Sequence, residues 1–248
     1  MGIIFFLFLF LSTQLPFDEA LASDLVVAID VGHTSAVYGA RSARGRGEYQ
    51  FNLDVGAQVK KALARHGYER AFMIVNPKRL ADRSRIAREK NADVLISFHH
   101  DSAQSHFLEE WTYNGKKERF CDRFRGFSLL VSTRNAKFRD SLRLATVIGR
   151  NLKRQGFAPT LHHAEDVPGE KHFLFNPELG IYRYDNLMVL RTANMPAVLV
   201  EVGVIINRDE ERILLREETR EKVARAIVNS VMEYQLIMGD RTRMLKRG

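Results

Sequence analysis

Residues Leu25 to Asp30 read LVVAID, and Val31, Gly32 and His33 follow. A run of β-branched and other apolar residues that ends at a glycine predicts a buried strand leading into a loop. From Phe51 onward apolar residues recur at helical spacing until His66-Gly67, which is typical of a helix and its stop. A strand, a loop and an amphipathic helix in this order favour an α/β layer domain.

The rest of the chain repeats this alternation. We expect further strands at residues 71–75, 94–99, 127–132, 187–191 and 197–201, and further helices at 80–91, 141–155, 209–215 and 220–238. Residues 104–126 and 158–184 fit neither pattern, and we expect them as excursions, where lids and binding surfaces tend to be built. No repeat or linker interrupts the chain, so we predict a single three-layer α/β domain with a mostly parallel or mixed central sheet flanked by helices.

Composition limits the kind of site that the chain can build. The 248 residues are enough for one large core, and Cys121 is the single cysteine. One cysteine excludes an intramolecular disulfide framework and every multi-thiolate metal site. A metal site would therefore need His and carboxylate ligands.

The amino terminus predicts export. Residues 3–11 read IIFFLFLFL, too short a run to cross a bilayer of about 30 Å as a helix, and Ala20-Leu21-Ala22 has the form of a cleavage site. We expect residues 1–22 to be a cleaved signal peptide; a retained anchor and a buried core strand are the alternatives. The segment holds two acidic residues and no Lys or Arg, so its removal raises the formal charge from +8 to +10. We then expect a catalytic domain at 23–240 and a basic tail at 241–248, in the periplasm or cell envelope of a bacterium.

Four polar residues stand where predicted elements end or begin. His33 follows the first strand, Glu48 precedes the first helix, and His99 and Glu201 end later strands. Ligands bind beyond the carboxyl ends of parallel strands, so these residues can converge despite their separation in sequence. Imidazoles and a carboxylate are also what a hydrolytic zinc site requires. Each residue has an ordinary alternative, such as a first-turn acid for Glu48 or a surface histidine for His33.

Four strings in order carry a resemblance to a known family: IDVGH (29–33), GARSARGRGE (39–48), ISFHHD (96–101) and PAVLVEVG (196–203). Together they resemble the zinc-dependent N-acetylmuramoyl-L-alanine amidases of the amidase_3 type. That family cleaves the amide bond between N-acetylmuramic acid and L-alanine of the stem peptide in bacterial peptidoglycan. The similarity runs from about Leu25 to Tyr234, nearly the whole predicted mature chain.

The resemblance implies one zinc ion per chain, held by His33, Glu48 and His99, with Glu201 as the catalytic carboxylate. Val31, Thr34, Ser35 and His100 stand where the family usually has proline, two glycines and a small residue. None of these departures removes a ligand; they bear on the shape of the substrate groove.

Several further residues have open roles. A substrate contact and an alternative ligand are the two roles open to His100, without either being favoured; those open to Asp101 are orienting an imidazole and a capping or loop role. His162-His163, with Glu165 and Asp166, resembles a metal cluster by composition. It lies in an irregular stretch outside the family's ligand positions, so we favour a flexible lid or an accidental site there.

The net positive charge indicates which binding partners the chain attracts. Arg83, Arg85, Arg88, Lys90 and the tail are expected on solvated faces that attract anionic wall polymer or a membrane surface. Nucleic acid is disfavoured because the chain is expected to be exported and carries no binding motif. We expect peptidoglycan as substrate, a regulatory protein partner, membrane contact only through an uncleaved leader, and a monomer. An exported zinc peptidase and a non-catalytic wall-binding or regulatory module are the alternative functions; four intact site residues argue against the module.

Overall fold

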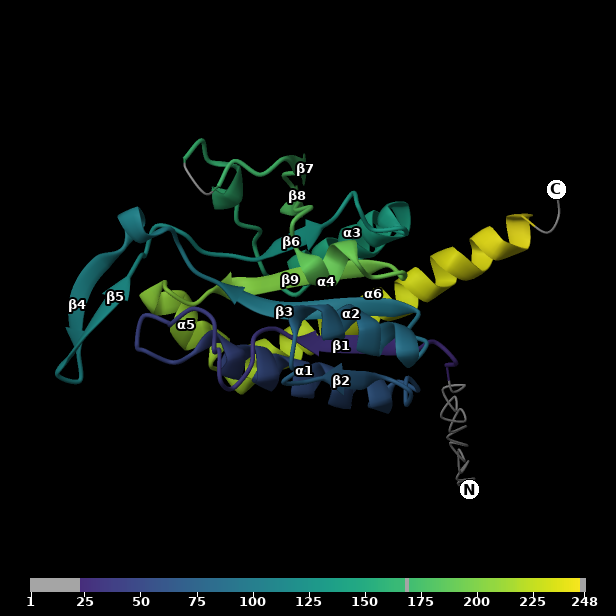
Figure 1. The fold of residues 1–248 in the computed structure, drawn as a ribbon, viewed down its shortest axis with the longest axis horizontal. Coiled ribbons are helices and arrows are strands. Elements are labelled where there is room, and N and C mark those ends of the chain that lie inside the picture. The colour runs from purple at the N-terminus through teal and green to yellow at the C-terminus, as the bar shows by residue number, and fades with distance from the viewer. Residues whose placement is uncertain (1–22, 168–169, 246–248) are drawn as a thin grey trace, which may run out of the picture.

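The structure is a computed structural model that describes residues 23–167 and 170–245. The predicted signal peptide and the last residues of the predicted tail lie outside this part of the chain. A seven-stranded sheet forms the centre, in the order β2-β1-β3-β9-β6-β8-β7, and β4 and β5 form a separate hairpin (Figure 1). The strands are β1 (Val27–Val31), β2 (Phe72–Ile74), β3 (Val94–Asp101), β4 (Glu109–Tyr113), β5 (Lys116–Phe120), β6 (Ser128–Val131), β7 (Leu174–Asn176), β8 (Ile181–Arg183) and β9 (Ala197–Val204).

Helices cover both faces of the sheet. They are α1 (Glu48–Arg65), α2 (Leu80–Glu89), α3 (Phe138–Arg154), α4 (Met188–Arg191), α5 (Arg208–Leu214) and α6 (Glu217–Leu245), with short 3-10 turns at Ser105–Phe107 and His162–Ala164. Alternate residues of the strands face opposite layers, as the pleat requires. Val27 and Ile29 belong to the core under α1, α3 and α6. Ala28 and Leu95 belong to the smaller core under α2 and α4. The predicted three-layer α/β domain is confirmed.

Strand direction divides the sheet into two halves. Strands β2, β1, β3 and β9 run parallel to one another, so the carboxyl ends of β1, β3 and β9 meet at one edge. Beyond β9 the directions are mixed, because β6 runs antiparallel to β9, β8 parallel to β6 and β7 antiparallel to β8. We call these the parallel half and the mixed half.

The structure corrects several expectations about elements. The predicted strand at 187–191 is wrong: Met188–Arg191 is the helix α4, with Leu190 packed in the smaller core. A short apolar run fits a buried strand and a buried helix equally well, and β3 and β6 already fill the two sheet positions next to β9. The excursion 104–126 contains the hairpin β4–β5, and 158–184 supplies β7 and β8 to the sheet. Helix α6 continues to Leu245, past the predicted start of the tail at 241.

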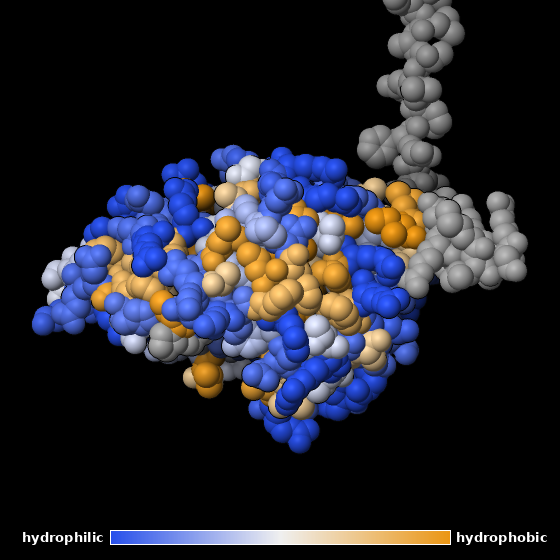
Figure 2. Space-filling model, turned by 90° about the horizontal axis from the view of Figure 1, so that it is seen from above, coloured by the Kyte–Doolittle hydropathy of each residue, from blue (hydrophilic) through white to orange (hydrophobic). Residues whose placement is uncertain are grey.

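The surface is mostly hydrophilic on the face that Figure 2 shows, as the charged composition predicts. Figure 2 shows mostly hydrophilic side chains on one face, with apolar side chains gathered in patches between them. Among the described helices none is both long enough and apolar enough to cross a membrane. Cys121 is a buried free thiol, packed with Phe124, Val204 and Ile206.

Candidate metal centre

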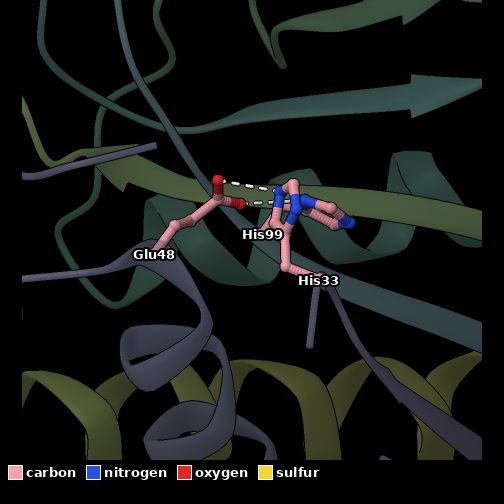
Figure 3. A group of neighbouring side chains, drawn as sticks. All are labelled: His33, Glu48 and His99. Atoms are coloured by element: carbon pink, nitrogen blue, oxygen red, sulfur yellow. Dashed lines mark hydrogen bonds and ion pairs between the residues drawn. The ribbon is translucent and has the colours of Figure 1, made fainter. Parts of the chain in front are cut away.

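Glu48 lies between two imidazoles at the carboxyl edge of the parallel half. Its Oε2 is 2.9 Å from Nε2 of His33, and its Oε1 is 2.9 Å from Nδ1 of His99 (Figure 3). The two rings lie edge to face, with centroids 4.9 Å apart. One ligand atom from each residue falls within 4.8 Å of the others, as three ligands of a single ion would. The structure thus brings together all three predicted zinc ligands.

Helix α1 begins at Glu48, and its surroundings hold the carboxylate in place. The backbone N–H of Ala40 donates to Oε2 at 3.0 Å, and the backbone N–H of His100 donates to Oε1 at 3.3 Å. Asn52, one turn along α1, donates to Oε1 at 3.3 Å. Burial would raise the pKa of Glu48, but its hydrogen bonds with His33 and His99 outweigh burial and hold that pKa well below its usual range. The group therefore stays an anion among two imidazoles.

A buried arginine fixes the loop that carries His33. Arg83 of α2 donates to the backbone oxygens of Val31 and His33, each at 2.6 Å, and to Oδ1 of Asp30 at 2.5 Å. The other carboxylate oxygen of Asp30 accepts from Ser97 at 2.6 Å. His33 has φ +63°, a left-handed backbone that needs such support. The expectation that Arg83 lies on a solvated face is wrong: its side chain is 4% exposed, because it turns toward the sheet.

Two glycines allow the rings and the carboxylate to approach the backbone closely. A Cβ on Gly32 would overlap the imidazole of His99. A Cβ on Gly39, whose φ is +76°, would overlap both Glu48 and the ring of His33. The sequence motifs contain these glycines because the metal centre has no room for a side chain at either position.

Glu201 stands beside this group on the neighbouring strand. It pairs with His99 in the parallel register of β3 and β9, so both side chains lie on the same face. Its Oε2 is buried, and no described residue gives that atom a hydrogen bond. Burial, together with the negative charges of Asp101 and Glu48, raises the pKa of Glu201 well above its usual range. A buried carboxyl with a raised pKa is the kind of group that takes up and releases a proton in general acid–base catalysis.

The two residues after His99 lie in different surroundings. His100 points to the opposite face, where its Nδ1 is 2.7 Å from Oδ1 of Asn52 and its ring lies against Phe51. It is 1% exposed, and burial lowers its pKa to about 3. The structure therefore places His100 behind Glu48, as a support, away from a substrate-facing surface. Asp101 contacts imidazoles, as one expectation had it, but they are those of His162 and His163.

Several supporting residues escaped the sequence analysis. Arg83 and Asn52 give no local signal, although the apolar or small neighbours of Arg83 on α2, Ser84 and Ala87, mark the buried side of that helix. Glu165 and Asp166, which were grouped with His162-His163 by composition, point elsewhere. Glu165 pairs with Arg123 and Asp166 with Lys171.

Comparisons with known proteins identify a family and a shared fold. The family described as N-acetylmuramoyl-L-alanine amidase (Amidase_3) matches residues 27–233. The chain is 28% identical over 251 residues to N-acetylmuramoyl-L-alanine amidase AmiC of Neisseria meningitidis, covering 90% of this chain and 54% of that protein. The chain therefore spans about half the length of this relative.

Two solved structures share the fold. The amidase Ami1 from Mycobacterium smegmatis superposes with a TM-score of 0.67 at 20% identity, over 86% of this chain and 98% of that one. The CwlD amidase from Clostridioides difficile, solved in complex with the GerS lipoprotein, has a TM-score of 0.63 at 18% identity, over 86% and 100% of the two chains. The family match spans the strands and loops that carry His33, Glu48, His99 and Glu201, and on this match the chain belongs to the Amidase_3 family of N-acetylmuramoyl-L-alanine amidases.

Proposed function

We propose that this chain is a zinc-dependent peptidoglycan amidase that hydrolyses the bond between N-acetylmuramic acid and the L-alanine of the stem peptide. The observation that carries the proposal is the arrangement of Glu48 between His33 and His99, with Glu201 next to His99 on the adjoining strand. Family membership supports the reaction class.

The residues fit a zinc ion. Two imidazole nitrogens and one carboxylate are a ligand set that zinc hydrolases use, and their ligand atoms lie within 4.8 Å of one another. Buried neighbours, chiefly Asn52, Arg83 and the backbone of Ala40, hold the ligands in place, as the second layer around a metal does. His33 is 30% exposed on its side chain, so the site is open on one side to water and substrate.

Zinc bound there would lower the pKa of a water molecule toward about 7 and polarise the scissile carbonyl. The chain's own contribution is proton transfer by Glu201. Its buried carboxylate would accept a proton from the attacking water and return it to the leaving alanine nitrogen. The raised pKa of Glu201 suits both steps, since the group must bind the proton and then release it. Glu48, whose pKa is held low, remains ionised and serves as a ligand.

The cellular setting follows as part of the proposal. The predicted leader and the wall substrate support an exported protein of the periplasm or cell envelope. The fold neighbour CwlD was solved in complex with the GerS lipoprotein, which supports our expectation of a regulatory protein partner here.

The test is a digestion of intact sacculi by the purified chain. Released fragments would be identified by mass, with and without a chelator, and after zinc or magnesium is restored. We expect stem peptides that begin with a free alanine amino group, their loss on chelation, and recovery with zinc only. Cleavage within the stem peptide would replace the amidase with a peptidase on the same scaffold. Zinc-loaded protein that releases nothing would favour a wall-binding module.

A further inference from the structure

A second cluster of metal-ligand side chains lies outside the candidate metal centre. It consists of Asp101 at the end of β3 and His162 and His163 in the 158–184 excursion; we call it the Asp101 cluster. Oδ2 of Asp101 is 3.1 Å from Nε2 of His162 and 2.8 Å from Nε2 of His163. The side chains are 14%, 3% and 12% exposed, so the three ligand atoms converge in the interior rather than on a solvated face.

Both rings of the cluster are oriented through their other nitrogen. Oγ1 of Thr160 is 2.8 Å from Nδ1 of His162, and Oε2 of Glu170 is 2.8 Å from Nδ1 of His163. Gln104 in turn donates to the second oxygen of Glu170 at 3.1 Å. Histidines that ligate a metal through one nitrogen are commonly fixed by a carboxylate or another polar group at the second nitrogen. The cluster has this form on both of its imidazoles.

The three atoms that face one another at the centre of the cluster are not satisfied by hydrogen bonds. Oδ2 of Asp101 and the Nε2 atoms of both histidines are buried, and none has a hydrogen bond of acceptable geometry with any described residue. Because Nδ1 of His163 faces a carboxylate, it carries the proton, and the neutral ring then turns a bare Nε2 toward another carboxylate oxygen. Such an approach requires a cation, either a second proton on the ring or a metal ion.

A proton satisfies only part of this arrangement. Burial lowers the pKa of His163, but Asp101 and Glu170 outweigh burial and raise that pKa to about 10. A second proton on His163 would place N–H groups of both rings against a single oxygen, Oδ2 of Asp101, to which neither ring makes a hydrogen bond of acceptable geometry. An ion surrounded by the three atoms would satisfy all of them at once.

We propose that Asp101, His162 and His163 form a second binding site for a divalent first-row transition metal, with zinc as the ion to test. Two imidazoles and one carboxylate favour such ions over magnesium or calcium, which prefer oxygen ligands. The site shares no ligand with the candidate metal centre and does not depend on the proposed amidase reaction. It revises our expectation from composition, which treated His162-His163 as a lid or an accidental site.

The second site would fasten the excursion to the sheet. Asp101 comes from β3, whereas His162 and His163 come from a segment that reaches the sheet at Phe127 and through β7 and β8. Asp101 and His163 also lie close enough to Glu201 for their charges to shift its pKa. An ion bound there would fix the positions of Asp101 and His163 relative to Glu201.

Zinc content per chain tests the proposal directly. The purified full chain would be loaded with zinc, freed of excess by gel filtration and measured by mass spectrometry of the metal. We expect two zinc ions in the wild type, one in His33→Ala and one in the double variant His162→Gln/His163→Gln. His172→Gln is the matched control, since this histidine lies in the same excursion with its ring centroid 6.0 Å from that of His163, and it should keep both ions. One ion in the wild type, lost entirely in His33→Ala, would overturn the second site while leaving the first intact.

A milder variant covers the case in which the double variant fails to fold. Glu170→Gln keeps all three proposed ligands and weakens only the orientation of His163, so zinc affinity at the second site should fall about 10- to 100-fold. Titration in a His33→Ala background isolates that site, and added zinc should raise the Tm of this protein. An unchanged affinity in Glu170→Gln, or a Tm that zinc does not move, would show that the cluster is an ion pair without a metal.

Discussion

The molecule contains two clusters of two histidines and one acidic residue, and different kinds of segment place their side chains. In the parallel half, His33, Glu48 and His99 are placed by the end of β1, the start of α1 and β3. In the second cluster β3 supplies Asp101, while both histidines come from an excursion that leads into the mixed half. In the first cluster the order of strands and helices is enough to bring the side chains together. In the excursion, side-chain contacts such as those of Thr160 and Glu170 are needed to orient the two histidines.

The largest effect is expected from a change at Glu201, beside the cluster of the parallel half, and it concerns the rate of hydrolysis. The variant Glu201→Gln keeps the shape of the side chain but cannot accept a proton, so hydrolysis of sacculi should fall about 10²- to 10⁴-fold. Zinc content at the candidate metal centre should stay unchanged, because Glu201 is not a ligand there. Release of stem peptides and bound zinc would be measured on the same preparation.

Exposed Glu178 in the mixed half provides the control for that variant. Glu178→Gln should hydrolyse sacculi at the wild-type rate. Loss of zinc in Glu201→Gln would make Glu201 a ligand and remove it from the role of proton carrier.

The fold and the site residues are easier to predict from the sequence in the parallel half than in the mixed half. The strands of the parallel half and the residues His33, Glu48, His99 and Glu201 stand in motifs that join a strand or helix to a polar residue, so their convergence could be expected from topology. The actual strands β3 and β9 run past His99 and Glu201 to Asp101 and Val204, because ends of elements are the weakest part of a pattern.

In the mixed half the local pattern carried less information. Strands β7 and β8 have three residues each, too few for an alternation to be visible, and α4 has four. The link between Asp101 and His163 spans 62 positions and depends on the path of the whole excursion. The sequence places Arg83 among surface charges because its partner Asp30 is distant in sequence and only the fold brings them together.

The next largest effect is expected on stability, at the ion pair under His33. Arg83→Met removes one partner of a buried pair and leaves Asp30 as an uncompensated buried charge, which costs about 3–5 kcal/mol. Urea denaturation would give the free energy of unfolding. Zinc binding should weaken as well, because the backbone oxygen of His33 loses its donor.

Arg85→Met is the matched control on the same helix. Arg85 pairs with Glu89 and Asp82 at the surface, where water screens the charges, so Arg85→Met should destabilise the fold far less than Arg83→Met. Equal destabilisation by both variants would contradict the view that the Arg83 pair anchors the metal-centre loop.

A smaller and more local effect is expected at Gly39. Gly39→Ala places a Cβ at φ +76° and against Glu48 and His33. The left-handed backbone alone costs about 1–2 kcal/mol, and the overlap should in addition displace the two ligands and weaken zinc binding. Gly115→Ala separates the two effects, because Gly115 has φ +74° with nothing near its Cβ position. Unfolding would be followed by urea and zinc affinity by competition with a chelating dye; a similar loss of affinity in both variants would contradict the role of Gly39.

The smallest effect is expected at Asp185, in the mixed half, and it depends on pH. Asp185 accepts hydrogen bonds from Arg183 at 2.6 Å and from the backbone of Thr133 at 2.7 Å. Burial would raise its pKa, but these bonds outweigh burial and lower its pKa to about 2. Its unfolded pKa is about 3.9, so the folded state is stabilised above that pH, and the stabilisation is lost as pH falls toward 2.

Partial exposure limits the expected gain to about 1 kcal/mol at pH 7. The difference in unfolding free energy between wild type and Asp185→Asn should therefore shrink by roughly half between pH 7 and pH 3. Zinc content should not change, since Asp185 touches neither cluster among the described contacts. A loss of zinc in this variant would show that the mixed half supports the metal sites through the sheet itself, and that the two halves are less independent than their construction implies.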